Sequence, residues 1–374
     1  MEHVHRDAGV QSVTFSRYGG PEVLQIVTTD VPVPGAGEVV VGVLAAGLNP
    51  VETSIREGRF QRKWPARFPA GQGSDFAGLI VSVGPHPEGG ARAPTPIKHT
   101  VRPGSGTTDH DWKVGDAVLG HTIRGAQATL VRVPGTAIIH KPERLSWEIA
   151  GSLYTAAVTA WRAVQDADPG PGRTVLVHAA AGGVGGIAAQ LARLRGARVI
   201  GTASPESFDQ LRQLGVVPVQ HGPGLAERLA RIAPDGIDAE LDHLGDDALA
   251  STPSGDASDM IVLAEIANMV ADHKIVVPVA AIYAFDQVED AYRELELGHA
   301  HGKIVLSLDP VGYPHQKVHG IDVRESEATR DQPDRVPAPL AHEVLPPVFG
   351  HRHRHPEQAA PEDSDRHGDR DLAG

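Results

Sequence analysis

Short apolar runs separated by glycine and proline mark the first third of the chain. Between residues 11 and 84, valine-rich stretches alternate with turn residues, which is the pattern of β-strands. Residues 85–111 contain many Gly and Pro and few apolar positions, so we predict a long loop there, and strand character returns at 112–120. The pattern therefore predicts a β-rich domain with one large loop insertion.

The pattern changes near residue 145. Residues 146–164 have the spacing of a helix, and 174–178 form an apolar strand that ends in a glycine turn. A helix at 187–195 and a second apolar run follow, and this order predicts a parallel βαβ unit. The remaining predicted elements, in chain order, are a helix at 223–233, a strand at 237–244, a helix at 259–273, a strand at 274–285, a helix at 286–300 and a strand at 303–308.

After residue 309 the sequence no longer has the pattern of a folded domain. Residues 310–374 are rich in Pro, His and charged side chains, so they cannot bury enough apolar surface to offset the entropy of ordering. We predict a disordered tail. Its histidines His351, His353 and His355 could bind a transition metal adventitiously, but a solvated polar tail is the simpler interpretation.

Composition narrows the classes of function. The 374 residues include no cysteine, which excludes disulfides, four-cysteine zinc sites and a thiol nucleophile. A net charge of −13 argues against a general nucleic-acid binder. The N-terminal residues lack the apolar core of a secretion signal, and no apolar run has membrane-spanning length. We therefore expect a cytoplasmic protein with neither a nucleic-acid nor a membrane partner.

The glycine turn is the strongest chemical signal. The strand at 174–178 runs into Ala179 and then Gly182, Gly183, Val184 and Gly185. Glycines there let the backbone approach a pyrophosphate, and the following helix offers unpaired amides and a positive dipole end. We predict that these five residues bind a dinucleotide, although a glycine turn without a ligand would have the same sequence.

The end of the second strand bears on which nucleotide binds. An acidic residue at this position would hydrogen-bond the ribose 2′-hydroxyl of NAD. The chain instead has Ser204, whose hydroxyl can donate to a 2′-phosphate, so we predict NADP(H) as the cofactor. Glu206 follows closely, and the nearest downstream cation is Arg212, which could equally be a solvated helix residue.

With these motifs in this order, the chain resembles the zinc-independent medium-chain dehydrogenase/reductases, in particular the quinone oxidoreductase-like (zeta-crystallin-like) branch. The motifs that carry the resemblance are 18–24 (YGGPEVL), 46–58 (AGLNPVETSIREG), 73–78 (GSDFAG), 114–118 (VGDAV), 153–157 (LYTAA), the glycine turn and 298–306 (GHAHGKIVL). The resemblance implies an α/β protein in which a GroES-like, β-rich catalytic domain is split in sequence around a doubly wound Rossmann domain. The implied division is 11–146 for the catalytic domain, 147–257 for the Rossmann domain, 258–309 for the return to the catalytic domain and 310–374 for the tail.

The resemblance also implies direct hydride transfer from a nicotinamide to a quinone or an α,β-unsaturated carbonyl. It puts Asn49 beside the nicotinamide and Thr155 near the cofactor, and these are the two catalytic residues we expect. Zinc-dependent relatives have a Cys where Asn49 stands and a His-Glu pair where Ser74 and Asp75 stand, so we expect no metal site. Asp75 is expected to satisfy backbone amides. Relatives often carry a Tyr at the position of Ser54 as a proton donor, which leaves that role open here.

One departure from the family pattern affects the expected function. Relatives continue after the fourth Rossmann strand through a helix and two further strands, whereas this chain reaches the helix at 259 through a polar link about forty residues shorter. We predict that the sheet lacks its last edge strands, that its fourth strand has an exposed edge, and that the homodimer of relatives is lost or altered. The alternative to a reductase is therefore a catalytically impaired nucleotide-binding remnant of the same family.

Overall fold

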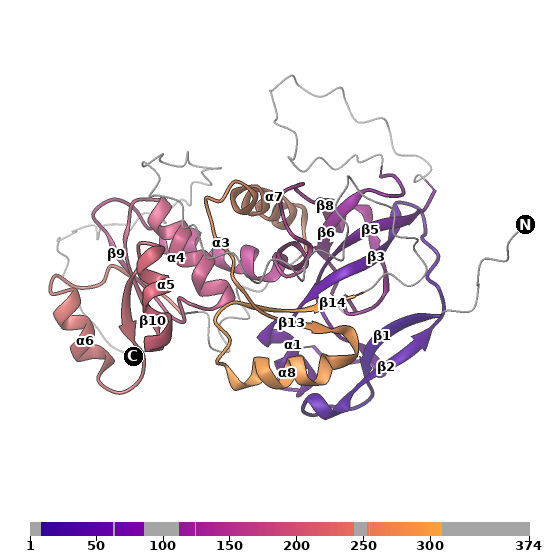
Figure 1. The fold of residues 1–374 in the computed structure, drawn as a ribbon, viewed down its shortest axis with the longest axis horizontal. Coiled ribbons are helices and arrows are strands. Elements are labelled where there is room, and N and C mark those ends of the chain that lie inside the picture. Colours follow the sequence, from indigo (N-terminus) through magenta and orange to yellow (C-terminus); the bar gives the residue numbers. More distant parts are fainter. Residues whose placement is uncertain are drawn as a thin grey trace, which may run out of the picture.

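The computed structural model describes residues 9–62, 64–85, 112–123, 125–242, 253 and 255–308. These ranges contain a β-rich domain and a parallel α/β domain that lie side by side (Figure 1). Almost all of the predicted insertion, much of the predicted link before residue 257 and the whole predicted tail lie outside the described residues.

Two sheets form the β-rich domain. The smaller has the order β2-β1-β4, and the larger has the order β13-β14-β3-β5-β6-β8, with β7 also paired to β3. All pairs are antiparallel except β13 with β14. The strands are β1 (Val10–Phe15), β2 (Leu24–Thr29), β3 (Glu38–Gly47), β4 (Ala70–Gly71), β5 (Asp75–Val83), β6 (Ala117–His121), β7 (Leu130–Pro134), β8 (Ile138–His140), β13 (Val279–Ala284) and β14 (Lys303–Ser307). Their apolar faces bury Phe15, Phe76 and Ile80 in a core of mainly Val and Ala.

Four parallel strands form the sheet of the second domain in the order β11-β10-β9-β12. The elements are α3 (Tyr154–Ala167), β9 (Thr174–Val177), α4 (Gly183–Leu194), β10 (Arg198–Ala203), α5 (Phe208–Gln213), β11 (Val217–Gln220), α6 (Leu225–Ile232) and β12 (Ala239–Leu241). This is the 3-2-1-4 strand order of a Rossmann sheet, so the predicted fold class is confirmed. Among the described strands β12 pairs only with β9, which makes it an edge of the sheet.

The predicted helix at 146–164 is wrong in one respect, because the structure contains two helices there. They are α2 (Trp147–Ala150) and α3, separated by three residues. The carbonyl of Gly151 accepts a hydrogen bond from the amide of Gly47 at 2.7 Å, so it is used by strand β3 and not by a continuing helix. A Cβ at Gly151 would lie 2.4 Å from the carbonyl oxygen of Ala45, so only glycine permits this approach.

Two other predicted bounds also need correction. Helix α4 begins at Gly183 and not at 187, because Gly182 already takes the extended conformation of an N-cap and the glycines form the first helical turn. The strand predicted at 274–285 begins only at Val279. Before it, the amide of Val276 donates to the side chain of Gln190 at 2.8 Å, so this stretch is tied to α4 and not to a neighbouring strand.

The last segment returns to the β-rich domain. Helix α7 (Ala257–Ala271) packs against α3 and β8, and helix α8 (Val288–Leu297) packs against β14 and α1 (Pro50–Arg56) (Figure 1). The chain therefore enters the Rossmann-like domain before β9 and returns to the β-rich domain after β12. No helix in the described part of the chain combines the length and apolar character that crossing a bilayer requires.

Candidate active site

The glycine turn joins β9 to α4 at the edge where the parallel strands end. Ala179 has a φ of 45°, and its amide donates to the hydroxyl of Thr202 at 3.0 Å. The next amide, that of Ala180, donates to the carbonyl of Thr202 at 2.9 Å. These two bonds fix the turn against β10. The first amides of α4 have no acceptors within the helix, so they are available to a ligand.

Close packing explains why this turn needs glycine at one position. A Cβ at Gly185 would lie 2.3 Å from the carbonyl oxygen of Ala179, closer than real Cβ contacts allow. A Cβ at Gly186 would lie 3.4 Å from the carbonyl oxygen of Ala180, which is ordinary contact. The turn thus brings Gly182, Gly183, Val184 and Gly185 together at a helix N-terminus, an arrangement that can hold a dinucleotide pyrophosphate.

A buried polar network lies across the domain junction from this turn. Lys303, the first residue of β14, is 5% exposed, and its ammonium donates to Asn49 Oδ1 at 2.6 Å and to the carbonyl of Leu48 at 3.0 Å. The Asn49 amide group donates in turn to Asp75 Oδ2 and to Glu52 Oε1, each at 3.2 Å. The Asn49 side chain therefore has a single orientation in which every polar atom is used.

Asp75 connects Asn49 to Thr155. Its carboxylate accepts from the hydroxyl of Thr155 at 2.5 Å and from the amide of Thr155 at 3.2 Å. Asp75 is fully buried on β5, and Thr155 lies in the first turn of α3. The structure thus brings the two predicted catalytic residues, Asn49 and Thr155, onto one carboxylate, and Asp75 satisfies a backbone amide as expected.

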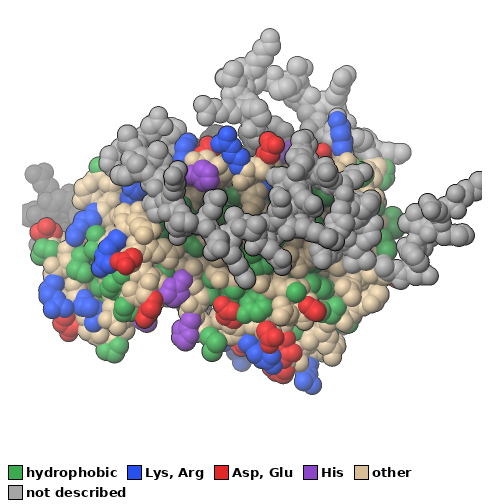
Figure 2. Space-filling view, viewed as in Figure 1, with side chains coloured by type: hydrophobic (Ala, Val, Ile, Leu, Met, Phe, Trp, Pro, Cys, Tyr) green, Lys and Arg blue, Asp and Glu red, His purple; other side chains and the backbone are tan. Residues whose placement is uncertain are grey.

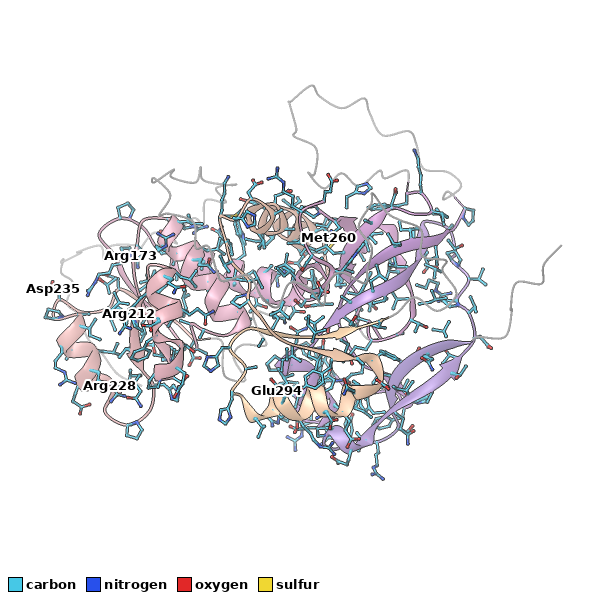
Figure 3. All side chains as sticks on the ribbon, in the orientation of Figure 1. Arg173, Arg212, Arg228, Asp235, Met260 and Glu294 are labelled. Atoms are coloured by element: carbon cyan, nitrogen blue, oxygen red, sulfur yellow. The ribbon has the colours of Figure 1, made fainter. Side chains whose placement is uncertain are left out.

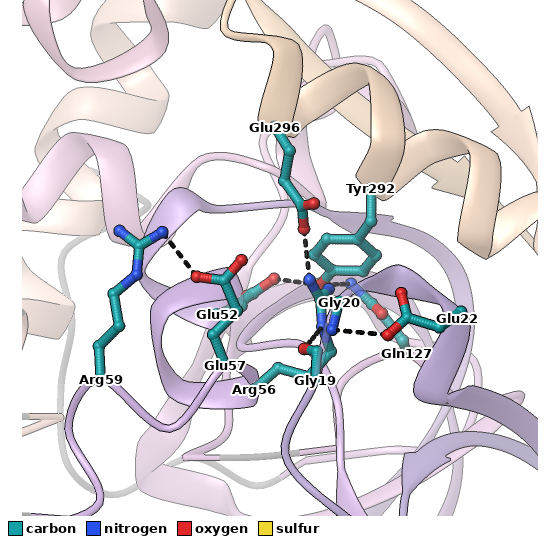
Figure 4. Close-up of polar contacts among 10 residues, drawn as sticks. All are labelled: Gly19, Gly20, Glu22, Glu52, Arg56, Glu57, Arg59, Gln127, Tyr292 and Glu296. Carbon is teal, nitrogen blue, oxygen red and sulfur yellow. Dashed lines mark hydrogen bonds and ion pairs between the residues drawn. The ribbon is translucent and has the colours of Figure 1, made fainter.

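Glu52 forms the other branch of the network (Figure 4). Its carboxylate accepts from the hydroxyl of Tyr292 at 2.6 Å, which is the Glu52 contact drawn in the figure. It also accepts from the amide of Ser74 at 2.9 Å and from the amide of Asn49 at 3.2 Å. Tyr292, from α8, also accepts from Gln127 at 2.8 Å. The Arg56 guanidinium lies over the Tyr292 ring, 5.1 Å from its centroid, and so helps to hold α8 against α1.

Burial dominates the electrostatics of this network. Desolvation lowers the pKa of Lys303 from its ordinary value, although the nearby charges of Asp75 and Glu52 raise it again in part. Desolvation raises the pKa of Glu52, opposed by its hydrogen bond from Tyr292. The same burial, together with the charge of Glu52, raises the pKa of Tyr292 well above its ordinary value. Proton positions in the network therefore depend on these three groups together.

Lys303 also touches the glycine turn directly. A Cβ placed on Gly183 would lie 2.7 Å from Cδ of Lys303, so the lysine stem packs against the first residue of α4. The ammonium group at the end of that stem is the one that holds Asn49. A single side chain therefore connects the candidate pyrophosphate site in one domain with the candidate catalytic residues in the other.

Ser204 lies apart from this network, at the carboxyl end of β10. Its hydroxyl hydrogen-bonds the carboxylate of Glu206, which is fully exposed. A hydrogen bond from the backbone amide of Glu206 lowers the pKa of its carboxyl group, and the hydrogen bond from the Ser204 hydroxyl lowers it further. The sequence already shows Glu206 close to Ser204, and the structure adds that the two side chains are hydrogen-bonded.

His121 is a buried group that the sequence did not single out. It is 9% exposed at the end of β6, directly opposite Asp75 in the strand register, and its ring stacks on Tyr154 with centroids 4.2 Å apart. Its Nε2 atom has no hydrogen-bond partner among the described residues. Desolvation lowers the pKa of His121 from 6.5, opposed by the charges of Asp75 and Asp259.

We expect His121 to make the fold sensitive to acid. Because its pKa is lower in the folded chain than in the unfolded one, its contribution to stability is complete above pH 6.5 and is lost as the pH falls below that value. His121→Phe keeps an aromatic ring on Tyr154 but cannot take up a proton. Urea unfolding at pH 7.5 and pH 5.5 should show a smaller acid-induced loss for this variant than for the wild type.

The matched control is His140→Phe. His140 is exposed on β8 and also contacts an aromatic ring, that of Trp112, with centroids 4.7 Å apart. The acid-induced loss should be the same in this variant as in the wild type. Equal acid sensitivity of His121→Phe and wild type would contradict the assignment.

Sequence reasoning missed part of this site. Lys303 lies in the motif at 298–306 but was given no role, and no role was predicted for Glu52, Tyr292 or His121. Glu52 could have been found, because Asn49 followed three residues later by Glu is the signature of a capping box at a helix start. The other three become members of the site only through contacts between distant segments.

The donor set does not fit a tetrahedral zinc ion. Asn49 Oδ1 already faces the Lys303 ammonium, and Asp75 and Thr155 are hydrogen-bonded to each other. A cation this close would repel a divalent metal, and the set lacks the Cys and His ligands of such sites. Within the described ranges, no three His, Asp or Glu side chains converge as a metal site.

The chain matches two known domain families and several curated proteins. Residues 35–143 match the family described as alcohol dehydrogenase GroES-like domain, and residues 253–306 match the family described as zinc-binding dehydrogenase. A probable quinone oxidoreductase of Schizosaccharomyces pombe is 31% identical over 249 residues, which cover 64% of this chain and 66% of that protein. The human quinone oxidoreductase is 34% identical over 205 residues, which cover 54% of this chain and 55% of that protein.

Solved structures agree on the fold. The quinone oxidoreductase of Escherichia coli, solved with NADPH, superposes with a TM-score of 0.64 over 80% of this chain and all of that one, at 23% sequence identity. The chain spans between half and two thirds of the length of the curated relatives described above. It belongs to the quinone oxidoreductase-like branch of the medium-chain dehydrogenase/reductase family.

Proposed function

We propose that the protein is an NADP(H)-dependent oxidoreductase that transfers a hydride directly to a quinone or an α,β-unsaturated carbonyl without zinc. The observation that carries the proposal is the contact of Lys303 with both Gly183 and Asn49, which puts a dinucleotide turn and a buried polar network at one junction. The names of the relatives, which are quinone oxidoreductases, support the class of acceptor.

The cofactor site in this proposal has two parts. The amides at the start of α4, from Gly183 to Gly185, bind the pyrophosphate, helped by the positive end of the helix dipole. Ala179 and Gly182 shape the turn, and Ser204 lies at the end of β10, where the adenosine ribose of a dinucleotide binds in this fold. The structural relative solved with NADPH shares this fold.

The bound nicotinamide supplies the hydride, so the chain has to orient the reactants more than it has to activate them. Asn49 and Thr155 perform that task from opposite domains. Asn49 is held in one orientation by Lys303 and Asp75, and Asp75 fixes the hydroxyl of Thr155. Burial of the whole network keeps water away from these groups and strengthens their hydrogen bonds.

A titration followed by turnover tests the proposal. NADPH and NADH are added separately to the full chain while nicotinamide fluorescence is recorded, and then 1,4-benzoquinone or 9,10-phenanthrenequinone is added. We expect NADPH to bind more tightly and to be oxidised when quinone is present. Binding without oxidation would favour the nucleotide-binding remnant, and failure to bind either nucleotide would contradict the proposed function altogether.

Independence from zinc is a separate prediction. Dialysis against 1,10-phenanthroline should leave quinone reduction unchanged, because Asn49, Asp75 and Thr155 are hydrogen-bonded to each other and to Lys303 and have no ligand role. The rate per protein molecule before and after dialysis is the measurement. A loss that added Zn²⁺ restores would show that a metal takes part.

A further inference from the structure

The segment that surrounds Ser204 carries an unusual set of charges for a phosphate site. Glu206 hydrogen-bonds Ser204 and stands where the 2′-substituent of the ribose would approach. A carboxylate suits a 2′-hydroxyl, as in NAD, and repels a 2′-phosphate. Binding of NADPH therefore requires positive charge from some other part of the structure.

Two arginines close in sequence are already engaged. Arg212, which is labelled together with Arg228 in Figure 3, donates to Asp209 at 2.6 Å and lies over the ring of Phe208, 5.6 Å from its centroid. Arg228, from α6, donates to four successive backbone carbonyls between Gln220 and Pro223, at 2.8 to 3.3 Å. Its guanidinium is used to hold the loop after β11.

That loop presents His221 to the Ser204 site. The amide of His221 donates to the carbonyl of Ala203 at 3.4 Å, which fixes the residue beside the end of β10. His221 is exposed, and the five carbonyl contacts of Arg228 anchor the loop on its other side. The backbone of residue 221 is therefore held beside the end of β10, and its side chain is open to solvent.

A second histidine comes from the other domain. His301 precedes β14, and its Nδ1 atom hydrogen-bonds the hydroxyl of the buried Ser207. After its own amide and the Ser204 hydroxyl, the charges of His301 and His221 also lower the pKa of the Glu206 carboxyl group. Some histidine side chains lie at the surface on the face of the molecule drawn in Figure 2.

We propose that His221 and His301 determine the choice between NADPH and NADH, by providing the positive charge for the 2′-phosphate in competition with Glu206. Histidine is the side chain that changes its charge between about pH 5 and 8. Protonated imidazoles favour NADPH, whereas neutral imidazoles leave Glu206 to favour NADH. The inference rests on the proposed function, and it makes coenzyme preference depend on pH.

The other charged groups near this site are carboxylates, guanidinium groups and one further histidine. On the β10 side these are Asp209 and Arg212, which pair with each other, and on the β11 side they are Arg228 and Glu227 in the first turn of α6. On the β14 side the remaining titratable neighbour is the exposed His299. A shift in preference between pH 6 and pH 8 therefore reports on histidines.

The dissociation constants of NADPH and NADH at pH 6.0 and pH 8.0 test the inference. We expect the preference for NADPH to fall about tenfold from pH 6.0 to pH 8.0, the size of two weak ion pairs. A 2′-phosphate gains negative charge over the same range, because its second ionisation is near pH 6. A site built on permanent cations would therefore bind NADPH more tightly at pH 8.0, which is the opposite direction.

Three variants separate the contributions. His221→Gln combined with His301→Gln should remove the pH dependence and lower the preference for NADPH, since glutamine can still bond Ser207 but carries no charge. Glu206→Gln should raise NADPH affinity at both pH values. His140→Gln, in the β-rich domain, is the control and should behave as the wild type.

The outcomes distinguish this inference from the proposed function. If neither nucleotide binds at either pH, the proposed function fails and the inference fails with it. If NADPH binds with a preference that does not change with pH, or that survives in the double histidine variant, the inference is overturned while the proposed function stands.

Discussion

Gly185→Ala is expected to weaken NADPH binding at least tenfold, because the added Cβ would lie 2.3 Å from the carbonyl oxygen of Ala179. The turn can accommodate this atom only by moving the start of α4 away from β9. The amides at that helix end then lose the arrangement that suits a pyrophosphate. Fluorescence titration gives the affinity, and thermal unfolding shows whether the domain remains folded.

Gly186→Ala is the matched control one residue further along. Its Cβ would lie 3.4 Å from the nearest carbonyl oxygen, so the backbone need not move. Alanine is also a better helix former than glycine by about 1 kcal/mol, and this variant should be as stable as the wild type or more stable. Equal NADPH affinity in the two alanine variants would contradict the assignment of the glycine turn.

Lys303→Met is expected to reduce kcat/KM for quinone about a hundredfold, as small misplacements of reacting groups can do. The variant removes the ammonium that fixes Asn49 Oδ1 and the carbonyl of Leu48, but keeps a stem that can pack on Gly183. Each unsatisfied buried acceptor also costs about 1–3 kcal/mol of stability, so the folded fraction has to be measured alongside the rate.

A double-mutant cycle with Asn49→Ala shows whether Lys303 acts through Asn49. If it does, the two single variants should each lose activity, and the double variant should lose little more than either one. Fully additive losses in kcat/KM, with all variants folded, would mean that Lys303 serves some other purpose. A loss confined to KM for NADPH would assign the lysine to the cofactor and not to Asn49.

Local sequence patterns predicted the helices and strands well where the backbone geometry depends on neighbouring residues, as at a glycine turn. The apolar runs and the glycine turn predicted strands β9 and β10 and the parallel order around them, because a tight turn into a helix needs glycine at Gly185 whatever surrounds it. The break between α2 and α3 was not predicted. It depends on a hydrogen bond to Gly47, about a hundred residues earlier in the chain, and helical spacing carries no information about such a contact.

The residues of the candidate site also fall into those that the sequence predicted and those that only the structure identifies. Asn49 and Thr155 were inferred from a family resemblance, and the structure adds that both bind Asp75. Lys303 and His301 could not be inferred from spacing, because their partners Asn49 and Ser207 lie 254 and 94 residues away in sequence. Burial, which alters the pKa of Lys303, is likewise a product of the whole fold.

The most direct test of hydride transfer uses NADPH that carries deuterium at C4 of the nicotinamide, supplied as each of the two diastereomers, with 2-cyclohexenone as the acceptor. Mass spectrometry of the saturated ketone reports where the label goes. With one diastereomer, we predict one deuterium at the β-carbon of the product, and a solvent-derived proton at the α-carbon. Saturated ketone without deuterium from either diastereomer would contradict the account.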